Sequence, residues 1–474
     1  GEPRDRLKQG EWVGVEGVKT ARGGDGDGAF RAQWGALKLS NEILLPLVGI
    51  GVGNLQHERI GWAIERSLPL GVRIIDTAHA SRNERVISQA LAKASGTIAP
   101  GEAMTVVTKV WYTHLGYNRT ILSVRESLDE LTSSSPEPSP NIIILLHWPR
   151  CDPRIAPWMR CEVEESELSE DIQRAGPPPH LTPELSWKES WRALEDLYDQ
   201  GIVHGIGVSN FNAQDMRDLV KNVARIQPHL YQGNIWSMLF DQELMTLLKD
   251  NEIAFQAYNV MNGVLAERQL KQCPNAVLEL WNLGQELSSS TYSSSEARMA
   301  MGDNIAGLEE KQSILPSQVV LRWLSQQQVG SIPRAATLAH LHANSPRFIE
   351  HIRELSPEQM GRADTAIRAL IRGEDISGKH THGVSATFTN WKRDAVRLFW
   401  VNEAEDNEEI IVAERISSGN SIGIQTFKGH KFVARPIVED GSEPAQPNHS
   451  RDTLEFEVSS EPGNPQSFHI RDDL

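Results

Sequence analysis

Seven polar side chains stand at or near the ends of short apolar segments in this chain. They are Asp76, Lys109, His147, Ser209, Asn210, Gln232 and Tyr258. An acid, an amine and an imidazole held together can hold and move a proton, whereas hydroxyl and amide groups hydrogen-bond a polar ligand. These residue types therefore indicate acid–base chemistry on a bound small molecule.

The segments that carry these side chains form a repeated pattern. Apolar runs lie at residues 47–52, 72–77, 104–110, 142–147, 203–210, 229–234, 253–258 and 329–334, and most are separated by ten or more residues with helical periodicity. Continuous apolar runs are typical of parallel strands covered by helices on both faces. The alternation predicts an α/β fold, a (β/α)8 barrel. Active sites of such barrels lie at the C-terminal ends of the strands, so we expect the seven side chains to converge.

Composition limits the classes of partner. The chain has 474 residues, 39% of them hydrophobic, with a net charge of −16 and an isoelectric point near 5.5. This acidic balance disfavours binding to nucleic acid or to an anionic membrane surface. No apolar stretch approaches the ~20 residues that span a bilayer. Cys151, Cys161 and Cys273 are not expected to form a disulfide framework or a metal site, which favours a cytoplasmic location.

The chain divides into four expected parts. Residues 1–36 are Gly-rich and charged, and are expected to be flexible; residues 37–362 form the barrel, preceded at 37–48 by a hairpin that closes its bottom. An acidic insertion at 150–185 is either a solvated loop or a specificity or partner-binding loop. Residues 288–299 are expected to form a second loop, and residues 363–384 a linker. Short β-prone segments at 385–471 predict a small all-β sandwich with a core of Phe388, Val396, Leu398, Trp400, Ile411, Ile424 and Phe456.

Several ordered segments resemble the aldo-keto reductase family. GVRIIDTAHASRNE (71–84) is similar to the family's GYRxIDTAxxYxNE, and TKVW (108–111), LLHWP (145–149), the segment 191–211 and the segment 315–328 match family segments in order. The resemblance covers about residues 37–360. It implies reduction of a small carbonyl substrate by hydride transfer from NADPH, without metal or flavin.

The catalytic positions implied by this resemblance are Asp76, Lys109 and His147, whereas the family's tyrosine corresponds to Ser81. Loss of one general acid costs a factor of roughly 10²–10⁴ in rate, so slow turnover is expected, with His147, a water held by Ser81, or Tyr112 as the substitute donor. Two structural alternatives stay open. Asp76 and Lys109 could be kept only as a buried ion pair, and His147 only as a core histidine.

The cofactor positions are retained unevenly. Ser209, Asn210 and Gln232 match residues that hydrogen-bond the nicotinamide carboxamide in the family, and Tyr258 matches the aromatic residue that stacks on the ring. At the adenosine end, Arg334 and Asn344 remain as candidate contacts, whereas His340 replaces the family's arginine. NADP is the implied cofactor, with NAD as the alternative.

The C-terminal segment resembles the von Hippel–Lindau β domain over about residues 385–471, most specifically at FWVN (399–402) and TFKGHKFVAR (426–435). That domain binds a hydroxyproline-containing peptide. The corresponding positions are Trp400, Thr426, His430 and Phe432, but no tyrosine follows Tyr292, and the family's helical attachment segment has no counterpart. Trp400 and Phe432 could equally be core residues.

Two functions follow from these resemblances. The first is an NAD(P)H-dependent oxidoreductase of aldo-keto reductase type, slow because of Ser81, joined to a peptide-binding β domain. The second is a catalytically dead barrel that acts as a nucleotide-sensing or scaffold protein beside a hydroxyproline-peptide-binding domain.

Overall fold

The computed structural model describes residues 35–53, 55–98, 102–136, 138–291, 314–335, 337–376, 384–402, 408–426, 429–437, 453–459 and 466–471. Most of the N-terminal segment expected to be flexible (1–34) and of the second expected loop (292–299) lie outside these residues. Contacts divide the chain into two units, residues 1–264 with 320–354, and residues 265–319 with 355–474. The chain thus leaves the first unit at residue 265 and returns to it at residue 320.

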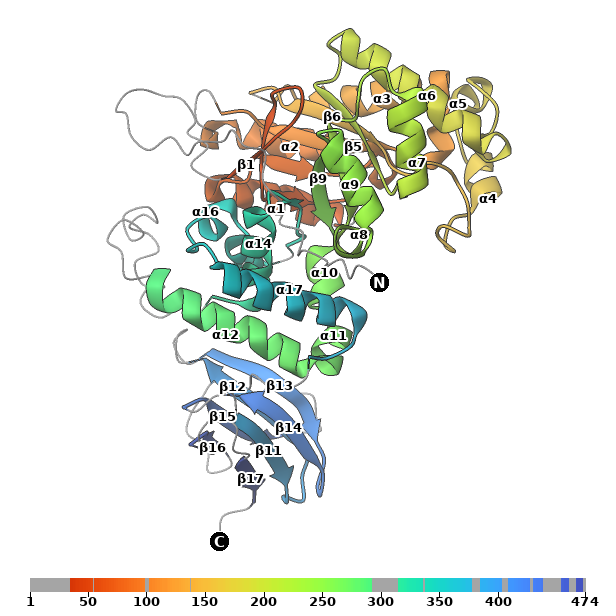
Figure 1. The fold of residues 1–474 in the computed structure, drawn as a ribbon. Helices are drawn as coiled ribbons and strands as arrows, with labels where there is room; N and C mark the ends of the chain where they lie inside the picture. Colours follow the sequence, from red (N-terminus) through yellow and green to blue (C-terminus); the bar gives the residue numbers. More distant parts are fainter. Residues whose placement is uncertain are drawn as a thin grey trace, which may run out of the picture. The chain divides into compact units, whose positions relative to one another are not determined.

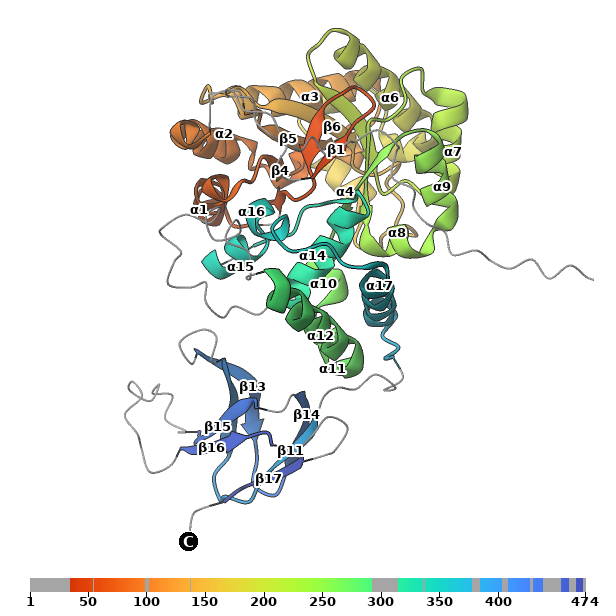
Figure 2. The ribbon, with the colours of Figure 1, turned by 60° about the vertical axis from the view of Figure 1, so that its left-hand side comes forward.

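The first unit is built on eight parallel strands whose spatial order follows the sequence. They are β3 (Ile50–Gly51), β4 (Ile74–Asp76), β5 (Thr105–Val110), β6 (Asn141–Leu146), β7 (Gly205–Ser209), β8 (Leu230–Asn234), β9 (Ala254–Tyr258) and β10 (Gly330–Ser331). A parallel bridge between Val48 and Ser331 joins the first and last strands. Figures 1 and 2 show β5 and β6 side by side near the centre of this unit. All eight apolar runs therefore contain strands, and the prediction of a (β/α)8 barrel is confirmed.

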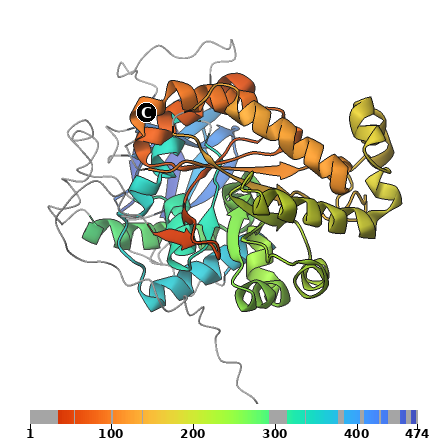
Figure 3. The ribbon, with the colours of Figure 1, turned by 90° about the horizontal axis from the view of Figure 1, so that it is seen from above.

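Helices cover the outside of these strands, as Figure 3 shows from above. They bury one face each because apolar residues recur at helical spacing. The helix α6 (Pro183–Asp199), for example, buries Trp187 and Trp191 almost completely. The helices of this unit are α1 (His57–Ser67), α2 (Glu84–Lys93), α3 (Tyr117–Thr132), α4 (Cys161–Ser166), α5 (Glu170–Arg174), α6 (Pro183–Asp199), α7 (Ala213–Asp218), α8 (Ile235–Phe240), α9 (Gln242–Asp250), α10 (Val260–Val264), α15 (Leu338–Ala343) and α16 (Pro346–Ile349), with α14 (Pro316–Gln326) crossing the unit limit.

A hairpin of β1 (Ala36–Lys38) and β2 (Leu44–Pro46) closes the end of the barrel at which the strands begin. Leu37 and Leu45 pack in one buried cluster with Ile74 and Leu230, the first residues of β4 and β8. The Asn41 side chain at the turn donates to the carbonyl oxygen of His204 at 2.8 Å. The expected hairpin is thus present, and it covers the end of the barrel at which the described strands begin.

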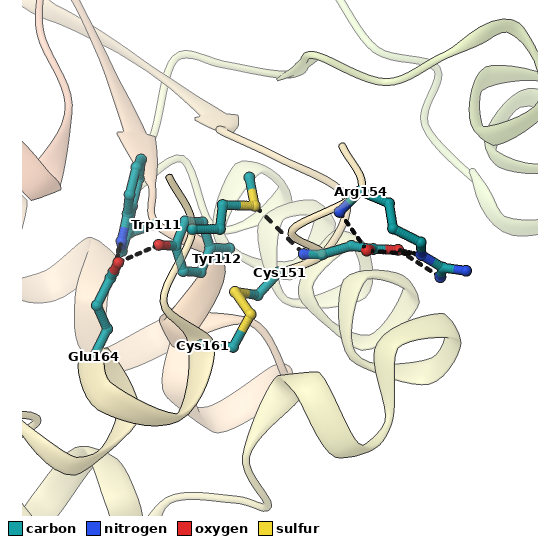
Figure 4. The surroundings of a disulfide bond; sticks show 8 residues. Trp111, Tyr112, Cys151, Arg154, Cys161 and Glu164 are labelled. Carbon is teal, nitrogen blue, oxygen red and sulfur yellow. Dashed lines mark hydrogen bonds and ion pairs between the residues drawn. A yellow bond between two sulfur atoms is a disulfide. The ribbon is translucent and has the colours of Figure 1, made fainter. Parts of the chain in front are cut away.

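The insertion after β6 is folded rather than extended. It contains α4, α5 and a short 3-10 helix at Pro179–Leu181, and Cys151 is disulfide-bonded to Cys161, with the two Cα atoms 5.8 Å apart (Figure 4). The expectation that the cysteines are not joined is therefore wrong for this pair. The reason is that the chain turns back after β6, so that α4 begins beside the residue at which the insertion starts. Cys273 is buried and free.

The second unit contains α11 (Glu267–Gln272), α12 (Pro274–Thr291) and α17 (Pro357–Arg372). Arg362 of α17 pairs with Glu279 and Glu286 of α12, and Figure 1 shows the two helices side by side. A capping box at Ser356 and Gln359 begins α17. This helix extends ten residues into the segment 363–384 that was expected to be a linker, and residues 377–383 of that segment lie outside the described ones.

The β region, residues 384–471, consists of two sheets (Figure 2). One has β11 (Val384–Asn390) between β14 (Ser421–Thr426) and β17 (Gln466–Ile470); the other has the order β13 (Glu408–Ile416), β12 (Val396–Asn402), β15 (Lys431–Pro436), β16 (Leu454–Glu457). Phe388, Val396 and Leu398 form its core as expected, with Trp400, Ile424 and Phe456 packed against them. Ile411 was expected in this core, but it is 43% exposed because its side chain lies on the outer face of β13. Among the described residues of the whole chain, no helix is both long and apolar enough to cross a bilayer.

Candidate active site

The C-terminal ends of the barrel strands surround one cavity of about 570 Å³. All seven side chains at the ends of the apolar segments line it, and Ser81 and Arg334 line it too. The remaining lining residues are Gly51, Gly53, Thr77, Ala78, Trp148, Asn259, Val260, Met261, Asn262, Ile332 and Pro333. The residues that the sequence places far apart are thus brought to one place by the parallel strand order.

Asp76 and Lys109 form a buried ion pair at the ends of β4 and β5. The Lys109 ammonium donates to both carboxylate oxygens, at 2.9 and 2.7 Å, and to the carbonyl oxygen of Thr77 at 2.6 Å. Gln232 of β8 adds a donor to Asp76 at 2.7 Å. Burial raises the pKa of Asp76, and the positive charge and hydrogen bond of Lys109 oppose that rise. All three donors of this ammonium are thus paired, which fixes its position.

His147 lies directly after β6, at the cavity wall. Its Nδ1 atom is buried and has no hydrogen-bond partner among the described residues, while the residue as a whole is partly exposed to the cavity. Burial, and then the nearby charge of Lys109, hold the pKa of His147 well below its usual value of 6.5. The imidazole is therefore neutral near pH 7, with one N–H to donate. The indole of Trp111 lies edge-on to it, with ring centroids 4.9 Å apart.

A hydroxyl–amide group forms another part of the wall. The Asn210 side-chain amide donates to the carbonyl oxygen of His147 at 2.9 Å and to the Ser209 hydroxyl at 3.1 Å, and it accepts from the Tyr258 hydroxyl at 2.5 Å. Asn210 has a φ of 61°, a left-handed conformation that asparagine tolerates better than most residues. Burial raises the pKa of Tyr258 to about 12, so this phenol stays protonated. Ser209 and Gln232 are almost completely buried, which fixes the orientation of these groups.

The position of the expected acid is filled by a small side chain. Ser81 ends a 3-10 helix at His79–Ser81 and is partly exposed in the cavity. A Cβ atom added at Gly53 would lie 3.3 Å from the Ser81 hydroxyl oxygen, so that glycine lies across from it. Ser81 therefore contributes a hydroxyl and open space where the family pattern has a phenol.

Tyr112 does not fill that gap. Its hydroxyl donates to Glu164 of α4, its ring is buried away from the cavity lining, and burial raises its pKa above the ordinary value. The alternative in which Tyr112 supplies the proton is therefore wrong. The insertion explains the difference, because Glu164 also accepts from the Trp111 indole at 2.8 Å and holds both aromatic residues (Figure 4).

Some lining residues were not singled out from the sequence. Trp148 follows His147, and Asn259, Met261 and Asn262 follow Tyr258. The signal that could have found them is their place, since the residues just after a barrel strand form its open end. Asn344 is at the end of α15 and is not among the lining residues, whereas Arg334 is exposed at the cavity.

In the β region, three of the four singled-out side chains lie together. The Thr426 hydroxyl and His430 Nδ1 are 2.9 Å apart, and the rings of Trp400 and His430 are 5.2 Å apart. Phe432 is 2% exposed and packs on Phe388 at 4.9 Å, so it belongs to the core. The Trp281 ring of α12 lies edge-on to Trp400 at 6.1 Å within the same unit.

Comparison with known proteins gives a consistent result for the barrel. The Aldo/keto reductase family model matches residues 50–368, a range that ends before the β region. The chain is 26% identical to the glyoxal reductase of Bacillus subtilis, covering 69% of this chain and 91% of that protein. It is 23% identical to aldo-keto reductase family 1 member A1 of Gallus gallus, covering 72% of this chain and 92% of that protein.

One solved structure agrees with this fold. An aldo-keto reductase crystallised in complex with NADPH is similar at 22% identity with a TM-score of 0.50, covering 72% of this chain and 88% of that one. The family model matches about two thirds of the chain, and the matched range includes the strands that surround the cavity. This chain therefore belongs to the aldo/keto reductase family.

Proposed function

We propose that the barrel is an NAD(P)H-dependent reductase of small carbonyl compounds, with NADP as its cofactor, and that Ser81 makes it slow. The observation that carries this proposal is the meeting of Asp76, Lys109 and His147 with the hydroxyl–amide group around one cavity. The alternatives of a bare ion pair and a core histidine fit less well, because all three residues line the same cavity. A cytoplasmic location remains part of the proposal.

The residues present fit a dinucleotide. Ser209, Asn210 and Gln232 place hydroxyl and amide groups on one wall, where a carboxamide needs donors and acceptors, and Tyr258 presents a ring to the same cavity. Arg334 provides an exposed cation suited to a phosphate group, which favours NADP over NAD. A reduced nicotinamide, when bound, supplies the hydride. The NADPH in the structure of the similar aldo-keto reductase supports this assignment.

The side chains around the cavity would then handle the charge that develops on the carbonyl oxygen. The neutral imidazole of His147 donates a hydrogen bond to that oxygen and orients it. The fixed ammonium of Lys109 lowers the cost of negative charge nearby, and Asp76 and Gln232 hold Lys109 in place. The Ser81 hydroxyl is a poor acid, so it positions a water that passes a proton to the carbonyl oxygen and regains one from solvent. Reduction proceeds, but without the phenol's contribution.

A tyrosine at position 81 should raise the rate. We expect Ser81→Tyr to increase kcat for NADPH oxidation by a reactive aldehyde about 10²-fold, within the range that one general acid contributes. Steady-state absorbance measurements at saturating NADPH test this. Ser81→Ala is the matched control and should lower kcat without changing NADPH affinity. If NADPH binds but no variant turns over, the nucleotide-sensing scaffold becomes the better account.

The depressed pKa of His147 predicts a specific pH dependence. The imidazole stays neutral until the pH falls well below 6.5. When the pH is lowered from about 8 to 5.5, kcat/KM should therefore show no loss near pH 6.5. The pH profile of wild-type protein, beside that of His147→Gln, checks this. A limb with an apparent pKa near 6.5 that disappears in His147→Gln would contradict the proposed state of the imidazole.

A second function is proposed for the β region, which is binding of a hydroxyproline-containing peptide. It is favoured by the Thr426–His430 pair beside the Trp400 ring, because a hydroxyl and an imidazole next to an aromatic face can pair the added hydroxyl of the pyrrolidine. Phe432 has no part in this site, since it lies in the core.

Matched peptides test this second function. The full chain should retain a hydroxylated proline peptide at least tenfold more tightly than the same peptide without the hydroxyl, and His430→Ala should remove the difference. Fluorescence anisotropy of labelled peptides gives both affinities, with Trp391→Ala, an exposed tryptophan of the same region, as control. Equal affinity for the two peptides would exclude hydroxyproline recognition.

A further inference from the structure

The insertion after β6 contains a covalently closed loop. The disulfide between Cys151 and Cys161 encloses residues 152–160, and Cys151 lies four positions after His147 (Figure 4). Turns within the loop are held by backbone hydrogen bonds from Ile155 and Met159. The loop therefore begins three residues after the cavity-lining Trp148, and the disulfide holds its two ends together.

The loop places one tryptophan against the aromatic residues at the cavity. Trp158 stacks on Trp111 with ring centroids 5.9 Å apart and lies edge-on to Trp148 at 5.7 Å. Trp148 lines the cavity, and Trp111 contacts His147. Trp158 extends this aromatic wall outward, yet it is 54% exposed. Because about half of this ring is exposed, its position depends on its contacts with Trp111, Tyr112 and Trp148 and on the loop that carries it.

The two ends of the loop are anchored differently. Helix α4 begins at Cys161. Its Glu164 carboxylate accepts hydrogen bonds from Trp111 and Tyr112, and its Glu165 carboxylate accepts two from the buried Arg119. These bonds do not involve the disulfide. Opening the disulfide should thus leave α4 and the barrel in place and release mainly the residues between the two cysteines.

We propose that the Cys151–Cys161 disulfide controls the outer aromatic wall of the substrate site, so that its reduction weakens the binding of aromatic carbonyl compounds and not of small aliphatic ones. This inference rests on the proposed reductase function. The substrate class follows from the wall, because flat rings prefer to stack on or meet the edges of tryptophan rings. Trp158 is a specificity-determining residue in this account.

The chemistry is an ordinary thiol–disulfide exchange. A dithiol reductant attacks one sulfur through its thiolate, forms a mixed disulfide, and is released as its own disulfide, while Cys151 and Cys161 each gain a proton and together accept two electrons. Cys161 is partly exposed, so a reductant can reach its sulfur. In reducing compartments such bonds are typically transient, which suits a reversible control.

The test compares two aldehydes on the oxidised and reduced full chain. Calorimetry with NADP⁺ present, and again without it, gives Kd for 4-nitrobenzaldehyde and for propanal. Dithiothreitol is removed by desalting under argon first, because thiols add to aldehydes. Titration of thiols in the denatured protein should rise from one, Cys273, to three.

Reduction should raise Kd for the aromatic aldehyde roughly threefold to tenfold, the size expected for loss of one or two aromatic contacts. Kd for propanal and for NADP⁺ should differ by no more than about twofold between the oxidised and reduced protein, because neither ligand depends on the aromatic contacts. Trp158→Ala should show the weakened affinity in both redox states. The double variant Cys151→Ser with Cys161→Ser should match the reduced protein, and Trp391→Ala, a tryptophan of similar exposure in the β region, should respond like the wild type.

Unchanged affinity for the aromatic aldehyde after verified reduction would overturn the inference, as would three free thiols in the protein as isolated. A normal redox response in Trp158→Ala would overturn it too. Failure of the reductase function is a separate result, seen as absence of NADP⁺ binding. The aldehyde titrations without nucleotide would still decide the role of the disulfide in that case.

Discussion

The buried pair of Lys109 and Asp76 is the constraint around which the open end of the barrel is organised. Two charges with side chains only 4% and 10% exposed are costly to remove from water unless each is fully paired. Here the ammonium has three acceptors, and the carboxylate has donors from both Lys109 and Gln232. Removing one partner of such a pair typically costs about 3–5 kcal/mol, because the other charge is left buried alone. The pair therefore ties β4, β5 and β8 together at the level where chemistry would occur.

That constraint also explains why the cavity can lack a phenol and remain otherwise intact. The bonds of the ion pair and of Asn210 are made among the barrel strands and the residues just after them, and none of these bonds involves residue 81. A serine there changes the acidity of the site without disturbing its frame. The same arrangement of residues supports either slow reduction or nucleotide binding alone. The two functions therefore differ in whether a proton can be delivered to the substrate, not in the fold.

Much of the barrel could be predicted from the sequence, because buried parallel strands leave continuous apolar runs and their C-terminal ends carry polar side chains. This reasoning found Asp76, Lys109 and Tyr258 at once, and it found the hairpin that closes the opposite end. It did not find the Cys151–Cys161 disulfide or Trp158, because the fold of the insertion depends on Glu164 and Glu165 reaching Trp111, Tyr112 and Arg119 across the chain. Tertiary contacts of this kind leave no periodic signal. Ile411 was misplaced for a related reason, since an apolar residue on a strand does not by itself reveal which face is covered.

A dihydronicotinamide ring bound beside Lys109, Asp76 and His147, as proposed, would lie close to Trp111 and Trp148. Tryptophan fluorescence during titration with NADPH tests it most directly, with NADH for comparison and Asn210→Ala to alter the amide contact. Quenching should saturate, with a higher affinity for NADPH than for NADH and an NADPH affinity at least tenfold weaker in Asn210→Ala. Quenching that does not saturate, or that is the same in Asn210→Ala, would contradict it.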